Sequence, residues 1–406
     1  RTTGLVNIVA MQSWMFLSSF ESLRRKLLST TTIGSLVHIG YNSFPEINSK
    51  IVQVCAFSAH AARVPEFLAR YVNLNSAEQS ANKDDVFLGR TAELTTSVHQ
   101  EIFSKLPGSP LVYWLSEHFL QMFDTNSTVS DFSVSDGQNK TGDNERYLRC
   151  HWEVDVRSIA EKSWIPYAKG GPWRKWYGNV YLVICWTSSA RQHYKKDKIA
   201  RLIPEYLWYR DGVTWSFITT KDIGFRYLEP GGTFDVGGSS LFFESEDLVY
   251  SMLAMLNSKP ATTILKFLNP TISLQVENVR SVPVPVFDMN RAATLARSAV
   301  QLSKIDWDID EASRGFKEIF FLECKNGAGS LGETWVRWSI KADERVLALK
   351  ELEERINELL IDAYGLQSEL SPEVPEDQIT LSRADREKDC QRLISYAIGC
   401  MMGRYS

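Results

Sequence analysis

The feature that most constrains this chain is an aromatic and basic stretch between positions 137 and 226. It holds seven of the 12 Trp residues of the chain. It also holds 16 Lys and Arg against 9 Asp and Glu, a charge of +7, although the whole chain carries −4. A positive segment within a negative protein is typical of a surface that binds a polyanion. The alternative is a Trp-rich core beneath an ordinary basic face, and the residues alone leave both open.

Length and composition exclude several other classes of protein. A chain of 406 residues has room for two or three domains. No apolar run approaches the ~20 residues of a transmembrane helix, and the first residues do not have the pattern of a signal peptide. The six Cys form no Cys-x-x-Cys pair and the six His no His-x-x-x-His pair, so no metal site is expected. Scattered cysteines fit a reducing cytosol, and we expect a cytoplasmic protein.

The first 125 residues read as the end of an α/β sheet. Short apolar runs predict strands over 5–10, 33–39 and 51–57, and apolar residues at helical spacing predict helices over 14–28 and 111–123. No series of strands and helices precedes them, and the central strands of a sheet need partners. We therefore expect the chain to begin inside a domain. Residues 124–136, rich in Ser, Thr and Asp, predict a linker.

The remainder divides into a region of strands and turns and a region of helices. Strands are predicted over 179–186 and on both sides of the Pro-Gly-Gly turn at 230–232, followed by a helix over 248–268 that is broken near Pro260. Residues 290–406 predict helices, the clearest over 342–364. Residues 341–391 carry 14 Asp and Glu against 7 Lys and Arg. This acidic face disfavours nucleic acid and predicts a scaffold.

Two short motifs suggest other chemistry but are weak. Gly327 to Gly332 matches Gly-x-Gly-x-x-Gly, yet no βαβ context follows, so an inter-helix loop is the better interpretation. Asp310, Glu323 and Lys325 loosely resemble the triad of a metal-dependent nuclease, a spacing that is common by chance.

Phe44-Pro45 lies between two predicted strands, where an aromatic ring could stack on an extruded base or simply plug the sheet edge.

Longer motifs carry a family resemblance. They are residues 4–20, 141–149 (Thr-Gly-Asp-Asn-Glu-Arg-Tyr-Leu-Arg), 167–179 (Tyr-Ala-Lys-Gly-Gly-Pro-Trp-Arg-Lys-Trp-Tyr-Gly-Asn), 225–227, 253–285, 364–376 and 393–405. In this order they resemble the PglX family of adenine-specific DNA methyltransferases. That family serves BREX phage-defence systems and is related to single-chain restriction–modification enzymes.

The resemblance implies a fold of mixed α/β and α+β class in three domains. Residues 1–125 would be the late part of a Rossmann-like methyltransferase sheet, 137–290 a mixed α+β target-recognition domain, and 291–406 an α-helical C-terminal region. Phe44 would stack on the flipped adenine. The candidate DNA-binding residues are Lys140, Thr141, Asn144, Arg146, Lys169, Arg174, Lys175, Trp176, Tyr177, Asn179 and Arg226.

Two departures from the family pattern bear on activity. Adenine-N6 methyltransferases carry Asn/Asp-Pro-Pro-Tyr/Phe, but this sequence contains no Pro-Pro dipeptide, and the Gly-rich turn for S-adenosylmethionine is also missing. We therefore expect no catalytic residue within the chain and no S-adenosylmethionine bound by it alone, although the complete enzyme would use that cofactor.

The expected partners are double-stranded DNA, the upstream catalytic half of the methyltransferase and other phage-defence proteins. Two alternatives remain at this point. The chain could be a DNA-specificity subunit that works with a separate catalytic chain, or a fragment of a restriction nuclease.

Overall fold

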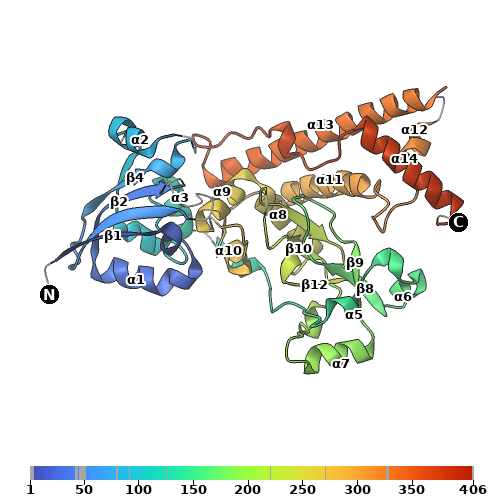
Figure 1. Cartoon of the computed structure of the whole chain (residues 1–406), viewed down its shortest axis with the longest axis horizontal. Coiled ribbons are helices and arrows are strands. Elements are labelled where there is room, and N and C mark those ends of the chain that lie inside the picture. Colours follow the sequence, from blue (N-terminus) through green and yellow to red (C-terminus); the bar gives the residue numbers. More distant parts are fainter. Residues whose placement is uncertain are drawn as a thin grey trace. The chain divides into compact units, whose positions relative to one another are not determined.

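The structure is a computed structural model that describes residues 4–41, 44, 52–78, 81–90, 92–125, 127–219, 221–269, 271–325 and 329–404 (Figure 1). The chain forms two compact units. The N-terminal unit comprises Arg1–Ser127 and Ile264–Thr271, and the C-terminal unit comprises Thr128–Thr263 and Ile272–Ser406. The boundary at 127/128 falls within the predicted linker. The ranges 137–290 and 291–406, expected as separate domains, lie for the most part in the same unit.

The N-terminal unit contains a five-stranded mixed sheet. Its strands are β1 (Leu5–Met11), β2 (Thr32–Gly40), β3 (Val54–His60), β4 (Leu68–Asn73) and β5 (Thr95–His99), in the order β1-β3-β2-β4-β5. β2 and β4 are parallel, and the other neighbours are antiparallel. The predictions over 5–10 and 33–39 are confirmed as strands, and the third strand begins at Val54 rather than at 51. The helices are α1 (Glu21–Thr30), α2 (Lys83–Arg90) and α3 (Glu117–Thr125).

The helix predicted over 14–28 is wrong in its first half. Two 3₁₀ turns, Gln12–Met15 and Ser18–Phe20, precede α1, and the residues between them are extended or irregular. Their free carbonyls are satisfied by the buried Arg24, whose Nη1 donates to Trp14 O at 2.9 Å and Leu17 O at 2.6 Å. A side chain thus replaces the hydrogen bonds that a continuous helix would supply.

The helix predicted over 111–123 is also wrong in its first half, because α3 begins at Glu117. Leu111 and Tyr113 are fully buried without being helical. The Leu111 N–H donates to Met15 O at 3.0 Å, and the Tyr113 ring stacks on Tyr71 with centroids 4.8 Å apart. Packing in the core therefore overrides the helical spacing of the apolar residues.

Strand β1 forms an edge of the sheet and exposes apolar side chains on both faces. Leu5 is 60% exposed, Val6 49% and Val9 63%. Successive residues of a strand point to opposite faces, so neither face of β1 is covered within the described residues.

The C-terminal unit contains a four-stranded and a three-stranded sheet, and the described residues also include a two-stranded sheet of β6 (Ser127–Thr128) and β14 (Pro283–Val284). β7 (Leu148–Cys150), β8 (Trp164–Ala168), β9 (Leu182–Cys185) and β12 (Thr233–Phe234) form a sheet in the order β12-β8-β9-β7. β10 (Gly212–Trp215), β11 (Phe225–Leu228) and β13 (Ser240–Leu241) form another in the order β11-β10-β13. The remaining short elements are α4 (Val129–Phe132), α5 (Asn144–Tyr147), α6 (Val156–Ala160), α7 (Ser188–Lys196) and α10 (Val276–Arg280).

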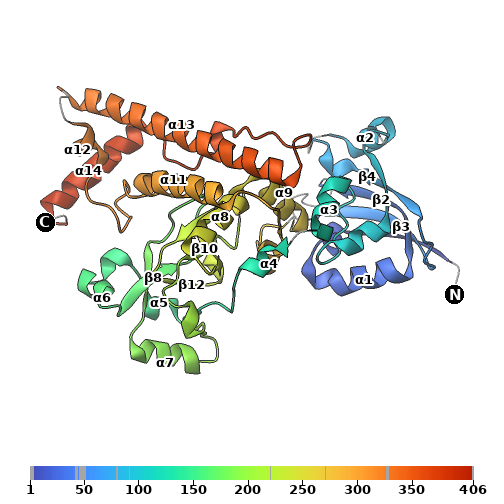
Figure 2. The same cartoon turned by 180° about the vertical axis from the view of Figure 1, so that it is seen from behind.

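Long helices complete this unit. They are α8 (Glu246–Asn257), α11 (Met289–Trp307), α13 (Leu331–Tyr364) and α14 (Arg386–Met401). The short α12 (Phe320–Cys324) also belongs to this unit, whereas α9 (Lys259–Leu268) is divided between the two units. α11 packs against both α8 and α13, and α13 runs alongside it in both views (Figures 1 and 2). The break near Pro260 is confirmed at Ser258, and α13 extends the predicted helix at its N-terminus by eleven residues. Within the described parts of the chain, no helix combines the length and apolar character of a membrane span.

The Trp residues of the 137–226 stretch contribute mainly to the core. Trp176, Trp186 and Trp215 are fully buried, whereas Trp152 is 56% exposed. Trp186 packs edge-on against Trp208 and also contacts Tyr194. The interpretation of a Trp-rich core therefore holds for the centre of this stretch.

Candidate nucleic-acid interface

The turn between β8 and β9 was the main candidate from the sequence. Its backbone enters the left-handed region at Gly170, Gly171 and Gly178, and also at Trp176 (φ 70°) and Asn179 (φ 65°). Such values are uncommon for residues with a side chain and persist only when surrounding contacts hold them. The turn therefore depends on what its side chains touch.

Lys175 and Trp176 both reach one carboxylate on α13. Lys175 Nζ donates to Glu353 Oε2 at 2.7 Å, and Trp176 Nε1 donates to Glu353 Oε1 at 2.8 Å. The side chains of Lys175 and Glu353 are only 11% and 4% exposed. Both oxygens of the carboxylate thus have partners from the turn, which satisfies a buried charge.

Arg174 connects the same turn to α11. Its guanidinium pairs with Asp306, its Nε donates to Tyr177 O at 2.9 Å, and its centre lies 5.1 Å from the centroid of the Trp307 ring. Its side chain is 16% exposed and that of Asp306 is 2% exposed. The planar guanidinium is suited to combining a carboxylate with an aromatic face, and here both come from the protein itself.

Asn179 and Arg226 are buried beside this turn. Asn179 Nδ2 donates to Pro172 O at 2.8 Å across the turn. Arg226 lies on β11, and the strand pairs with the turn through Trp176 N–H to Phe225 O and Tyr227 N–H to Trp176 O, both at 2.8 Å. Arg226 itself is 2% exposed.

The structure thus brings Arg174, Lys175, Trp176, Tyr177, Asn179 and Arg226 together as one buried cluster, here called the turn cluster. Arg174, Lys175, Trp176 and Asn179 each have hydrogen-bond partners within the fold, and the cluster is largely shielded from solvent. Their contact with DNA stays a prediction.

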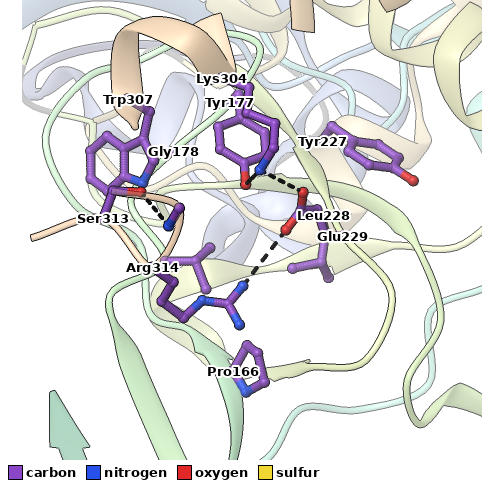
Figure 3. Close-up of a pocket in the computed structure, with 12 residues that line it drawn as sticks. Pro166, Tyr177, Gly178, Tyr227, Leu228, Glu229, Lys304, Trp307, Ser313 and Arg314 are labelled. Carbon is purple, nitrogen blue, oxygen red and sulfur yellow. Dashed lines mark hydrogen bonds and ion pairs between the residues drawn. The ribbon is translucent and has the colours of Figure 1, made fainter. Parts of the chain in front are cut away.

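A pocket of about 240 Å³ opens between this cluster and α11 (Figure 3). Lys304 Nζ donates to the Tyr177 hydroxyl at 2.6 Å and to Glu229 Oε1 at 3.0 Å, and Arg314 lies 3.6 Å from the other Glu229 oxygen. Burial raises the pKa of Tyr177 to about 12, so its hydroxyl stays protonated at neutral pH. Two cations sharing one carboxylate hold α11 and the following loop against the strands.

The other predicted DNA-binding residues are mostly exposed. Lys140, Asn144 and Arg146 lie on the surface around α5. Asp143 is the N-cap of this helix, and its carboxylate accepts from the Arg146 N–H at 3.0 Å. Thr141 is buried and donates to Asn144 Oδ1 at 2.7 Å.

Lys169 is half-buried and pairs with Asp235 at 3.1 Å. Its ion-pair partner Asp235 directly follows β12 and is not part of the turn cluster.

Sequence reasoning missed a second group of cations around α7. Lys195, Lys196, Lys198 and Arg201 are exposed, and the run 191–201 holds five Lys and Arg against one Asp. Lys140 and Arg201 exchange both backbone hydrogen bonds, at 2.8 and 2.9 Å. A hollow of about 790 Å³ is lined by Lys140, Lys195 and Arg201 among others. We call this hollow, with Lys196 and Lys198 beside it, the basic groove. Its signal in the sequence was the density of charge rather than any motif.

Phe44 is 41% exposed. Pro45 and residues 42, 43 and 46–50 lie outside the described residues. The surroundings of Phe44 therefore give no geometry for a base pocket.

Among the described residues of the N-terminal unit, we find no cofactor turn for S-adenosylmethionine. Such sites place a Gly-rich turn directly after a parallel strand. The parallel strands described in the N-terminal unit are β2 and β4. β2 ends in a single glycine, Gly40, and the sequence has no further glycine between the end of either strand and the next strand or helix.

The two weak motifs acquire no supporting context. Residues 320–324 are helical rather than the strand that a nuclease centre needs, and Asp310 Oδ1 accepts from the Ala312 N–H at 2.9 Å. No group of three His, Cys, Asp or Glu among the described residues could hold a metal ion. In the Gly-x-Gly-x-x-Gly motif, residues 327 and 328 are outside the described residues and Gly332 lies inside α13.

Two curated proteins are similar to the whole chain. The adenine-specific methyltransferase PglX of Lacticaseibacillus casei (strain Zhang) is 31% identical over 100% of the chain and 36% of its own length. The adenine-specific methyltransferase BrxX of Escherichia coli O9:H4 (strain HS) is 30% identical over 98% of the chain and 34% of its own length. The resemblance drawn from the motifs is thereby confirmed. The chain spans about a third of the length of these relatives, and no protein-family model matches it.

A solved structure shows the same fold. The type IIL restriction–modification enzyme MmeI, determined in complex with DNA, aligns with a TM-score of 0.50 at 9% identity, over 91% of this chain and 48% of its own. The mixed α/β class expected from the sequence agrees with this likeness. At so low an identity the likeness extends to the fold alone.

Proposed function

We propose that this chain is the target-recognition part of an adenine-N6-specific DNA methyltransferase of a phage-defence system. The observation that carries the proposal is the match to two adenine-specific methyltransferases along essentially the whole chain. The complete enzyme would transfer a methyl group from S-adenosylmethionine to adenine in a short DNA sequence. The residues of this chain would bind and orient the duplex.

The C-terminal unit would contact DNA through its exposed cations. Lys140 and Arg146, together with Lys195, Lys196, Lys198 and Arg201 of the basic groove, have exposed side chains that can approach phosphates. Asn144 is an exposed amide in the same region, and Asn can read an adenine edge. The DNA complex of MmeI, which shares the fold, supports DNA as the partner.

The turn cluster would act indirectly in this scheme. Its charges join the strands of the recognition region to α11 and α13. We infer that Arg174 and Lys175 fix the orientation of the recognition surface rather than touch the duplex.

The N-terminal unit would be the late part of the Rossmann-like catalytic sheet. The apolar side chains that β1 exposes on both faces fit a sheet that continues into an upstream catalytic half. That half would supply the Asn-Pro-Pro-Tyr motif and the cofactor turn. Phe44 would stack on the flipped adenine, and in the complete enzyme Phe44→Ala should reduce methylation far more than cofactor binding.

The test is to select DNA from a random duplex library with the purified chain. We expect enrichment of one short sequence, together with neither S-adenosylmethionine binding by calorimetry nor methylation. Lys140→Ala with Arg146→Ala should weaken binding to the enriched duplex. Stoichiometric cofactor binding, or a library that shows no enrichment, would contradict the proposal.

A further inference from the structure

Two buried arginines in this protein differ strongly in their hydrogen-bond partners. Arg24 is 1% exposed and makes four hydrogen bonds to backbone carbonyls, at 2.6 to 3.0 Å. Arg226 is 2% exposed, and its contacts are longer, with Nη1 3.3 Å from Arg174 O and Nη2 3.4 Å from Ser216 Oγ. Its Nε has no hydrogen-bond partner. Arg226 therefore has unused donor capacity in the interior.

No acid among the described residues compensates the charge of Arg226. The two carboxylates that contact the turn cluster already have partners, because Asp306 pairs with Arg174 and Glu353 pairs with Lys175. Burial and the neighbouring Arg174 lower the pKa of Arg226 to about 10, which still leaves it protonated at neutral pH. A buried cation with only weak neutral partners is costly, and such charges are normally paired.

Arg226 is one of the residues that line a small pocket. Gly171 and Gly224 form part of its wall, and a Cβ at Gly224 would lie 2.7 Å from Arg174 O. Ser216 also lines the pocket. Asp222 lines it as well, and its Oδ1 accepts a hydrogen bond from the Ile223 N–H at 2.7 Å. The free space is about 10 Å³, which is room for a single atom of the size of water.

We propose that Arg226 and this pocket bind one compact anionic atom, either a halide ion or a single oxygen of a DNA phosphate. An anion there would supply the missing counter-charge and accept from Nε. Lys221, whose Nζ lies 4.6 Å from the Trp173 ring centroid, adds a cation beside the pocket residue Trp173. The halide form of the proposal is independent of the function proposed above, because it needs no DNA.

The first experiment measures thermal unfolding of the chain in sodium bromide and in sodium gluconate at equal ionic strength, because gluconate is too large for the pocket. A bromide concentration about ten times the Kd of the site should raise Tm by about 3 °C. Arg226→Gln should abolish the difference. Arg210→Gln is the matched control, since this half-buried arginine in the same unit donates to the Phe243 carbonyl and should leave the difference intact.

A second measurement needs no variant, in case Arg226→Gln does not fold. Crystals soaked in bromide should show an anomalous peak within hydrogen-bonding reach of the Arg226 guanidinium. DNA affinity in bromide and gluconate then identifies the source. Weaker binding in bromide, seen in wild type but not in Arg226→Gln, indicates a phosphate oxygen, whereas unchanged binding indicates a resident halide. No peak together with no bromide effect on Tm or on DNA binding overturns the proposal.

Discussion

At the scale of single residues, the turn cluster shows how a basic motif can be internal. Lys175 looks like a phosphate ligand in the sequence because it lies between aromatic residues next to a Gly-rich turn. In the structure its partner is Glu353, 178 residues away. The sequence around Lys175 does not predict such a distant partner.

We predict that Glu353→Gln destabilises the C-terminal unit strongly. Gln keeps an oxygen for Trp176 Nε1 but leaves Lys175 as an uncompensated buried cation, which typically costs about 3–5 kcal/mol. Adding Lys175→Met should recover most of this loss, because the pair is then neutral. Urea unfolding of wild type and both variants measures the effect. A double variant no more stable than Glu353→Gln would contradict this explanation.

His38 in the N-terminal unit gives a prediction about pH. Burial, with a contribution from Lys83, lowers the pKa of His38 to about 4, and its ring contacts Tyr113 Oη at 3.1 Å and Gln12 Oε1 at 2.5 Å. The unfolded state binds a proton near pH 6.5 and the folded state does not. Stability should therefore be complete above pH 6.5 and fall by up to about 3 kcal/mol as pH drops to 4. His38→Gln should flatten this part of the curve, measured by urea unfolding from pH 4 to 7.

At the scale of elements, the termini of α13 provide a matched pair of glycines. Gly365 ends the helix at φ 71°, its N–H donating to Asp362 O at 3.1 Å and the next N–H to Ile361 O at 3.0 Å. Gly365→Ala should cost about 1 kcal/mol, because a Cβ is disfavoured in this conformation although no atom blocks it.

Gly332→Ala is the opposite case. Gly332 lies in the first turn of α13, where a Cβ would approach only Ser330 Oγ, at 3.8 Å. This change should stabilise by about 0.4–1 kcal/mol. Thermal unfolding of both variants tests the pair, and a shift of the same sign for both would show that the ends of α13 are not formed as described.

An element could be predicted from the sequence where local apolar spacing determines it, and could not where contacts with distant residues determine it. β2 and the helix over 342–364 follow from local apolar spacing, because one pattern determines both the element and its buried face. The strand β1 follows from its apolar run alone, since neither of its faces is covered within the described residues. The segment 111–115 has the same spacing as a helix but is held by Met15 and Tyr71, which lie far away in sequence. Such tertiary contacts have no local signal.

The candidate site follows the same division. The exposed Lys140 and Arg146 could be named from composition alone. The buried state of Arg174 and Lys175 could not, because it depends on Asp306 and Glu353 in distant helices. The charge run at 191–201 was visible in the sequence but belongs to no motif.

At the scale of the whole molecule, the central claim is that the exposed cations of the C-terminal unit carry DNA affinity. A chain with a net negative charge that binds a polyanion must concentrate its positively charged side chains on one part of its surface. The α13 face is acidic, so its charges serve as an internal control. We predict that neutralising the exposed Glu351 leaves sequence preference unchanged in DNA binding.

The most direct measurement is DNA binding across a salt series for two folded variants. One is Lys195→Gln with Lys196→Gln and Lys198→Gln in the basic groove, and the other is Lys175→Met with Glu353→Gln in the turn cluster. Lys388→Gln, an exposed lysine on α14, is the control. We predict that the groove variant flattens the log–log salt slope by about 0.9 for each phosphate that it no longer neutralises, while the turn-cluster variant and the control match wild type. A groove variant with the wild-type slope, beside a turn-cluster variant with weakened affinity, would contradict the claim.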